Sequence, residues 1–266
     1  MVRRFTFLVA CAAVSTACGS KATHDPFSVE PEQLVGRLQN LALPRVAHPE
    51  NLPVTDTILS RFQSGVATTL DGAGFTVIGQ DDVAGIWEPI LDDIGGYYDP
   101  RTGGIIEEKR KAANQRLRRQ LRVRYGVDAI VYAELIIVDA PYSDGVARWD
   151  GTSQSVAGFW DKLFETVGAV ADALVQEPHV SSLPVGTAPA VTLQVVVEDL
   201  EGRELYVNWG GVAVIADVET GEWLEPAEAF QDAKRFERAV DIAMQPLVQR
   251  TVQQAQVDSS KIGNRK

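Results

Sequence analysis

Hydrophobic residues recur along the chain with two different periods, and each period predicts a type of element. A spacing of three or four positions indicates amphipathic helices. The first such helix is capped by Thr55 or Asp56 and stopped by Gly72 and Gly74. Alternating or short continuous apolar runs indicate strands. Helices are therefore expected over about 56–70, 81–91, 105–125, 158–176 and 226–252, and strands over 75–78, 128–139, 146–156, 191–197, 205–209 and 212–215.

Three local features refine this pattern. Glu134 is the only interruption in the apolar stretch over 129–138, which is typical of a strand buried on both faces. Gly210 and Gly211 predict a β-bulge before the last strand. Pro246 is expected to kink or break the final helix after Gln245, because proline lacks the backbone N–H that a helix requires.

The order of elements predicts an α/β (α+β) fold, with a mixed central sheet covered by helices in a single globular domain over residues 54–254. Residues 18–53 contain 5 of the 13 prolines and are interpreted as a tether. Within this tether, a short strand around Arg45–Ala47 and one or two helical turns within Glu32–Leu41 are the elements that the sequence allows. Residues 255–266 are expected to form a polar C-terminal tail.

Residues 1–17 have the layout of a secretory signal peptide. Arg3 and Arg4 precede an apolar run over 5–14 that is too short to span a bilayer, and small residues follow up to Ala17. The next residues, Cys18-Gly19-Ser20, resemble the lipobox of bacterial lipoproteins. That resemblance implies a lipid anchor on Cys18 and, through Gly19, a location on the periplasmic side of the outer membrane.

Two other interpretations of the leader remain open. Cys11 follows residues that fit a lipobox better, but it leaves an apolar core shorter than the roughly 7 residues expected. Cleavage after Ala17 without lipidation leaves Cys18 as an unpaired thiol in an exported chain that has only 2 cysteines. Lipidation at Cys18 leaves the mature domain without disulfides or free thiols, which excludes thiol redox chemistry and thiolate metal sites.

Charge and composition exclude one class of partner. The formal net charge is −11, and removal of residues 1–17 takes away two arginines and makes it −13, with 23 basic against 36 acidic residues. Such a surface repels nucleic acid. The hydrophobic fraction of 45% is sufficient for a substantial core.

Two segments, LDGAGFTVIGQDDV (70–83) and YGVDAIVYAELIIVDA (125–140), together with the element order, carry a family resemblance. They are similar to the periplasmic α/β domain shared by the curli secretion-channel lipoprotein, the lipoprotein activators of peptidoglycan synthases and the N-terminal domain of TolB. The resemblance implies a non-enzymatic assembly or regulatory role in the cell envelope. No functional residue of that group maps onto this chain.

A basic stretch between Lys109 and Arg124 reverses the acidic character of the chain locally. It suggests a site for an anionic ligand, such as lipopolysaccharide phosphate, or for an acidic partner. The alternative is a solvated helix face whose charges follow the helix dipole. The candidate residues are Arg116, Arg118, Arg119, Arg122 and Arg124.

Two further segments have both a functional and a structural interpretation. Phe159, Trp160 and Phe164 begin the helix expected over 158–176, and they form either a partner or self-association interface or part of the core. The stretch from Gly95 to Gly104 either wraps a ligand or forms an ordinary turn.

Catalytic chemistry has little support in the sequence. The three histidines, at 24, 48 and 179, lack zinc-type spacing, and no cofactor or metal motif occurs. The sequence therefore favours a membrane-anchored envelope lipoprotein that binds another envelope protein or itself. The alternatives are an anionic-ligand carrier and a hydrolase of envelope glycan that uses two carboxylates from Glu134, Asp139 and Asp150.

Overall fold

The computed structural model describes residues 24–30, 37–156, 185–217 and 222–263. The helix expected over 158–176 therefore lies outside the described residues. The described elements, in chain order, are β1 (Asn40–Ala42), α2 (Asp56–Gly72), β2 (Thr76–Ile78), α3 (Gln80–Ile94), α4 (Glu107–Tyr125), β3 (Ala129–Ser143), β4 (Val146–Trp149), β5 (Thr152–Ser155), β6 (Gly186–Asp199), β7 (Glu204–Val214), α6 (Pro226–Ala229) and α7 (Ala233–Gly263).

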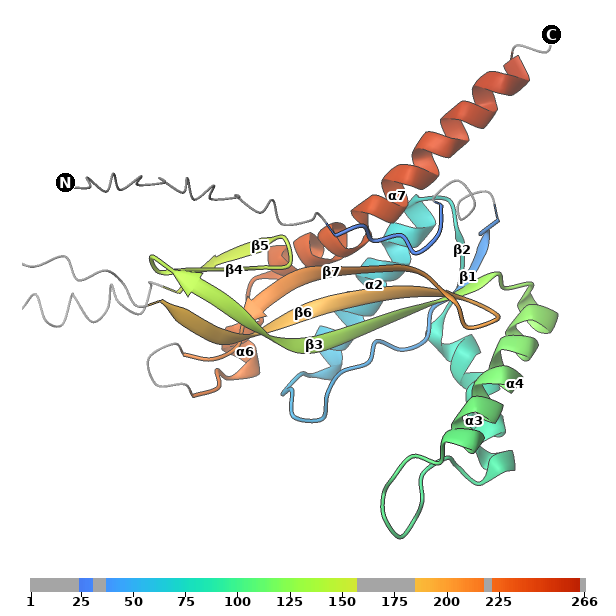
Figure 1. Ribbon diagram of the computed structural model, residues 1–266, viewed down its shortest axis with the longest axis horizontal. Helices are drawn as coiled ribbons and strands as arrows, with labels where there is room; N and C mark the ends of the chain where they lie inside the picture. Colours follow the sequence, from blue (N-terminus) through green and yellow to red (C-terminus); the bar gives the residue numbers. More distant parts are fainter. Residues whose placement is uncertain (1–23, 31–36, 157–184, 218–221, 264–266) are drawn as a thin grey trace, which may run out of the picture.

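The described strands form one mixed sheet of seven strands, which confirms the predicted fold class (Figure 1). β1 lies between β2 and β3 and is parallel to both. β3 then pairs with β6 in antiparallel register from Ala129 opposite Asp199 to Tyr142 opposite Gly186. β7 pairs with β6, and the β4–β5 hairpin extends from the end of β3.

Helices cover both faces of the sheet. On one face, α2 and α7 pack on β3, β6 and β7 and form the larger core, in which the rings of Phe62 and Phe236 lie 4.8 Å apart. On the other face, α3 and α4 enclose a smaller core that contains Ile130. Because Ala129 and Val131 belong to the first core and Ile130 to the second, the start of β3 is buried on both faces. The prediction holds only there, since Glu134 is exposed and residues 136–138 are only partly buried.

The predicted tether is too long. Residues 40–42 form β1 in the parallel part of the sheet, and Leu41, Ala42 and Leu43 are completely buried. The chain then follows β3, because the N–H of Ala47 donates to the carbonyl of Ala133 over 3.0 Å. The Arg45–Ala47 segment thus makes a single bridge instead of the expected strand. Residues 40–53 belong to the globular domain.

The single strand expected over 146–156 is a hairpin of β4 and β5. Asp150 and Gly151 have φ values of +40° and +72°, and Asp144 and Gly145 at the preceding turn have +51° and +71°. Two successive residues with positive φ match the twist of a two-residue hairpin turn, and Asp-Gly is a favoured sequence for it. The second Asp-Gly pair was the signal that the sequence prediction missed.

The predicted final helix is also corrected. It consists of α6 and a separate α7, which continues through Pro246 without ending and includes residues 255–263 of the expected tail. Proline at 246 removes the N–H that would bond to the carbonyl of Ile242. The side-chain amide of Asn208 in β7 donates to that carbonyl over 2.9 Å. The sheet therefore supplies the donor that the helix lacks.

The predicted bulge is present in β7. Val191 pairs with Ala213 and Thr192 pairs with Gly211, so Val212 is the extra residue. Gly210 lies against α7, where an added Cβ would be 2.0 Å from the carbonyl oxygen of Ala239. Only glycine allows the sheet and α7 to approach so closely here.

Candidate functional site

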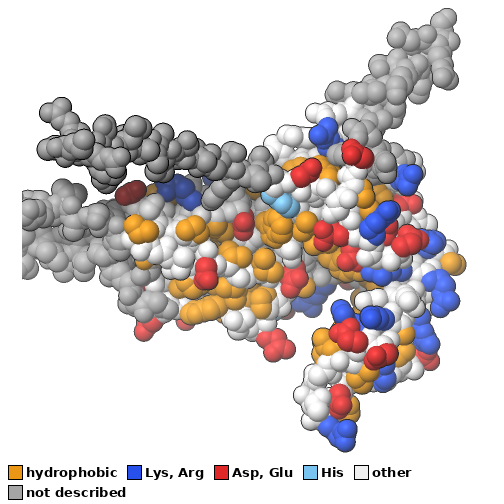
Figure 2. All heavy atoms as spheres, viewed as in Figure 1, with side chains coloured by type: hydrophobic (Ala, Val, Ile, Leu, Met, Phe, Trp, Pro, Cys, Tyr) orange, Lys and Arg blue, Asp and Glu red, His pale blue; other side chains and the backbone are white. Residues whose placement is uncertain are grey.

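Three of the five candidate arginines of α4 form ion pairs within the chain. Arg116 pairs with Asp93 of α3, Arg118 with Glu198 of β6 over 2.6 Å, and Arg122 with Glu201 of the β6–β7 turn over 2.6 Å. In Figure 2, basic and acidic side chains are interspersed over α3 and α4. The structure therefore favours a structural role for most of this basic stretch.

The Arg118–Glu198 pair is the most enclosed of the three. The side chains are 18% and 27% exposed, and the neighbouring Tyr132 is also mostly buried. Burial raises the pKa of Tyr132, the charge of Glu198 raises it further, and Arg118 opposes this effect. Gly202 leaves room for the arginine, since an added Cβ there would be 2.6 Å from Nη1. This cluster attaches α4 to the sheet.

The two remaining arginines of the predicted set, Arg119 and Arg124, are exposed. Neither forms an ion pair with any residue that the structure describes. They do not line the pocket described next. The predicted anion site is thus divided between residues that hold the fold together and residues that face solvent.

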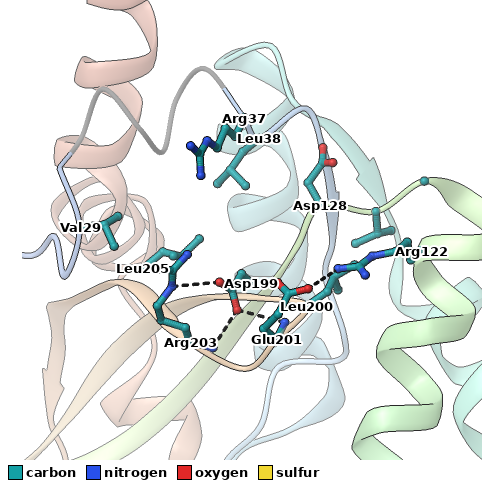
Figure 3. A pocket seen from close by; sticks show the side chains of 12 residues that line it. Val29, Arg37, Leu38, Arg122, Asp128, Asp199, Leu200, Glu201, Arg203 and Leu205 are labelled. Carbon is teal, nitrogen blue, oxygen red and sulfur yellow. Dashed lines mark hydrogen bonds and ion pairs between the residues drawn. The ribbon is translucent and has the colours of Figure 1, made fainter.

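A pocket of about 390 Å³ lies where the end of α4, the β6–β7 turn and the segment before β1 meet (Figure 3). We call it the Arg37 pocket. Leu38, Leu200 and Leu205 supply apolar lining, and each is less than 10% exposed. Its charged lining consists of Arg37, Arg122, Arg203, Asp128, Asp199 and Glu201.

The carboxylates of the Arg37 pocket already accept hydrogen bonds from the protein. Oδ2 of Asp128 accepts from the backbone N–H groups of residues 39 and 40, both at 2.9 Å. Asp199 accepts from two backbone N–H groups of the β6–β7 turn and, over 3.0 Å, from Nε of Arg203. Glu201 is bound by Arg122. These acids therefore fix the start of β1 and the turn.

Arg37 differs from the other charged residues of the pocket. Figure 3 shows its guanidinium directed into the cavity, beside Leu38. No carboxylate within the described ranges forms an ion pair with it. A guanidinium offers five donors in a planar fork that fits a carboxylate or phosphate. Next to apolar walls, it suits a ligand that combines an anionic group with an apolar one.

The sequence prediction included Arg122 of this pocket but missed Arg37, Asp199 and Arg203. Arg37 lies in the stretch interpreted as a tether, where no periodicity marks a buried surface. Asp199 and Arg203 could have been found, because an aspartate before a glycine turn commonly accepts hydrogen bonds from the turn backbone.

The alternative of a glycan hydrolase requires two carboxylates close together. Glu134 and Asp139, two of its three candidate residues, are not so placed. Glu134 and Asp139 lie five positions apart in β3, so their side chains point to opposite faces and are separated by about 17 Å along the strand. Paired glycosidase carboxylates lie about 5–10 Å apart. Asp150 accepts a hydrogen bond of 2.6 Å from the hydroxyl of Thr192, which holds the β4–β5 turn against β6.

The segment Gly95–Gly104 closes on itself as a turn. The N–H of Asp99 donates to the carbonyl of Gly104, and the N–H of Gly103 donates to the carbonyl of Asp99, both over 2.8 Å. Tyr98 and Ile105 form a bridge at its base. These groups of the loop are already bonded to each other, which favours the structural interpretation.

Several predicted site residues lie outside the described residues. These are Cys18, Phe159, Trp160 and Phe164, and no structural statement applies to them. Among the residues with described positions, no group of three metal-ligating side chains occurs. None of the described helices has the length and apolar character needed to cross a bilayer.

Comparison with known proteins adds no family to this geometry. No family model matches the chain, and no curated protein sequence matches it significantly. The resemblance to envelope lipoproteins therefore stays a prediction from the residues quoted above.

Proposed function

We propose that this protein is a lipoprotein of the bacterial cell envelope, anchored to the outer membrane through Cys18, and that it acts without catalysis. Its α/β domain binds an acidic, partly apolar segment of another envelope protein in the Arg37 pocket. The leader sequence and Cys18-Gly19-Ser20 support the anchor. The orientation of Arg37 supports the binding role.

The charge distribution of the pocket explains the choice of an acidic segment. Arg122 pairs with Glu201 and Arg203 with Asp199, so among the described residues Arg37 is the lining cation that has no carboxylate partner. The Arg122–Glu201 pair is more than half exposed on both sides, so it contributes little to stability. Its arginine can therefore turn toward an incoming carboxylate at little cost.

The apolar lining explains why the ligand is a polypeptide segment rather than a free anion. A cavity of 390 Å³ has room for one or two side chains, and three nearly buried leucines border it. Burial of an apolar side chain contributes about 1.5–3 kcal/mol. A charge-assisted hydrogen bond to Arg37 adds orientation.

Photo-crosslinking tests the binding role in cells that make the full-length protein. A photoreactive p-benzoylphenylalanine at Val29, which lines the pocket, should give a discrete adduct with an envelope protein. The same residue at Gln115, exposed on α4, should not. Arg37→Glu should reduce the adduct several-fold, because it places a carboxylate where the ligand carboxylate binds.

The control variant is Arg119→Glu, which makes the same charge change at an exposed arginine outside the pocket. Equal loss of adduct in both variants, or equal adducts from Val29 and Gln115, would contradict the assigned pocket. Incorporation of labelled palmitate tests the anchor separately. It should disappear in Cys18→Ser, and incorporation that persists in this variant would refute acylation at Cys18.

A further inference from the structure

Residues 24–28 run along the outer edge of β7 and pair with it through a single β-bridge. Phe27 pairs antiparallel with Tyr206. The N–H of Val207 donates to the carbonyl of Pro26 over 2.9 Å, and the N–H of Ser28 donates to the carbonyl of Leu205 over 3.1 Å. Nε2 of His24 donates to the carbonyl of Val207 over 3.1 Å. The N-terminal segment is therefore fixed to the domain from His24 onward.

Aromatic contacts strengthen this attachment. The ring of His24 lies 4.6 Å from that of Trp209, and the ring of Phe27 lies 5.2 Å from that of Tyr206. Tyr206 is completely buried and bonds to α7, so Phe27 is attached to the core. Aromatic pairs at such separations contribute about 0.5–1.5 kcal/mol beyond the area that they bury.

Five residues separate Cys18 from His24. Whatever path they follow, a polypeptide spans at most about 3.6 Å per residue, so the Cα atoms of Cys18 and His24 lie within about 22 Å of each other. A flexible tether ending at residue 53 would instead have a mean reach of about 30–35 Å and a far larger maximum. The pairing with β7 thus shortens the connection to the anchor.

We infer that the β7 edge and the adjoining part of α7 are the membrane-facing side of the protein. The five-residue linker between Cys18 and His24 holds this side next to the lipid surface. This inference rests on the proposed acylation of Cys18. The loop between α3 and α4 lies on the opposite side of the molecule from residues 24–28 (Figure 1). It therefore points away from the membrane.

The same arrangement places the Arg37 pocket close to the lipid surface. Val29 and Leu205 line the pocket, and the carbonyl of Leu205 accepts a hydrogen bond from residue 28 of the paired segment. A partner segment is thus bound beside the membrane rather than at a distance from it. This favours a partner that is itself attached to the membrane.

Energy transfer to the bilayer tests the inference on the acylated protein in liposomes that contain acceptor-labelled lipid. The sequence has no cysteine besides Cys11 and Cys18, so one introduced cysteine carries the only donor dye. Positions Gln245 and Thr102 are both exposed. Gln245 lies on α7, one turn after Ile242, whose carbonyl accepts from Asn208 of β7, and Thr102 lies in the α3–α4 loop. Transfer from Gln245→Cys should exceed transfer from Thr102→Cys several-fold.

Two variants test the role of the short linker between Cys18 and His24. Insertion of about 20 glycine and serine residues between Lys21 and Ala22 leaves the folded domain intact and should abolish most of the difference between the two positions. The pair Phe27→Ala with Trp209→Ala should do the same by releasing the segment. The control Trp87→Ala alters an aromatic residue of α3, away from the segment, and should preserve the difference.

The two proposals fail in different ways. If palmitate is incorporated but the two dyes transfer equally, or if the insertion leaves the difference unchanged, the membrane-facing side is wrong and the anchor stands. If palmitate is not incorporated at Cys18, the anchor is wrong, and the orientation that depends on it is refuted as well.

Discussion

Asn208 of β7 donates its side-chain hydrogen bond to the carbonyl of Ile242, the acceptor that Pro246 leaves without a helical donor. A proline inside a helix normally breaks or kinks it, because the freed carbonyl and the ring both disturb the turn. Here the sheet supplies the missing donor. A strand residue thereby stabilises a helix position 34 residues later in the chain.

This relationship predicts coupling between the two residues. Asn208→Leu should lower the free energy of unfolding by about 1–3 kcal/mol, because it leaves the carbonyl of Ile242 without a donor. In a Pro246→Ala background, the restored N–H of residue 246 bonds to that carbonyl, so the same substitution should cost clearly less. Urea unfolding of the four variants measures the coupling, and strictly additive effects would contradict it.

The arginines of α4 should differ in their contribution to stability. Arg118→Ala removes the partner of a mostly buried Glu198 and should lower the free energy of unfolding by about 2 kcal/mol or more. Arg119→Ala, one residue later on the exposed face, should change it by less than about 0.5 kcal/mol. Thermal or urea unfolding compares the two, and equal effects would show that the ion pair has no special role.

Tyr206 should make the protein sensitive to alkali. Burial raises the pKa of Tyr206 above its ordinary value of 10.0, and its hydroxyl donates to the carbonyl of Ala243 over 2.5 Å. Above pH 10 the unfolded chain loses this proton while the folded protein keeps it. The free energy of unfolding therefore falls as pH rises, by up to about 1.4 kcal/mol per pH unit.

Tyr206→Phe should flatten this pH dependence, although it lowers stability at neutral pH by about 1 kcal/mol through loss of the hydrogen bond. A residual slope should remain, because burial also raises the pKa of Tyr97 and Tyr132. Urea unfolding between pH 9 and 11 measures the two slopes. Identical slopes in both proteins would refute the assignment to Tyr206.

The elements that the sequence predicted well are those stabilised by local signals. The helix over 56–72 combines apolar spacing with Thr55, whose hydroxyl accepts from the N–H of Ile58, and α4 ends at Gly126 with a φ of +63°, where its sequence indicated. β1 has no such signal. It is a strand because β2 and β3 bond to it from both sides and Asp128 binds the backbone at its start.

The site was less predictable than the fold for the same reason. Arg122 stood out because basic residues cluster in its helix, but the same clustering marked Arg116 and Arg118, which pair with Asp93 and Glu198 outside the pocket. Arg37 has no distinctive neighbours in the sequence. Its position beside the pocket depends on how β1, the β6–β7 turn and α4 assemble, and a single sequence does not contain that information in any local pattern.

The pairing of residues 26–28 with β7 also covers part of the edge of the sheet. The first half of β7 would otherwise present unpaired N–H and C=O groups at the border of the sheet, and exposed borders of this kind promote aggregation between chains. Proteolytic removal of residues 24–28 would thus release the domain from its anchor. The same cleavage would expose the backbone N–H and C=O groups at the edge of β7 and so promote aggregation. Recombinant versions intended to stay monomeric should begin before His24.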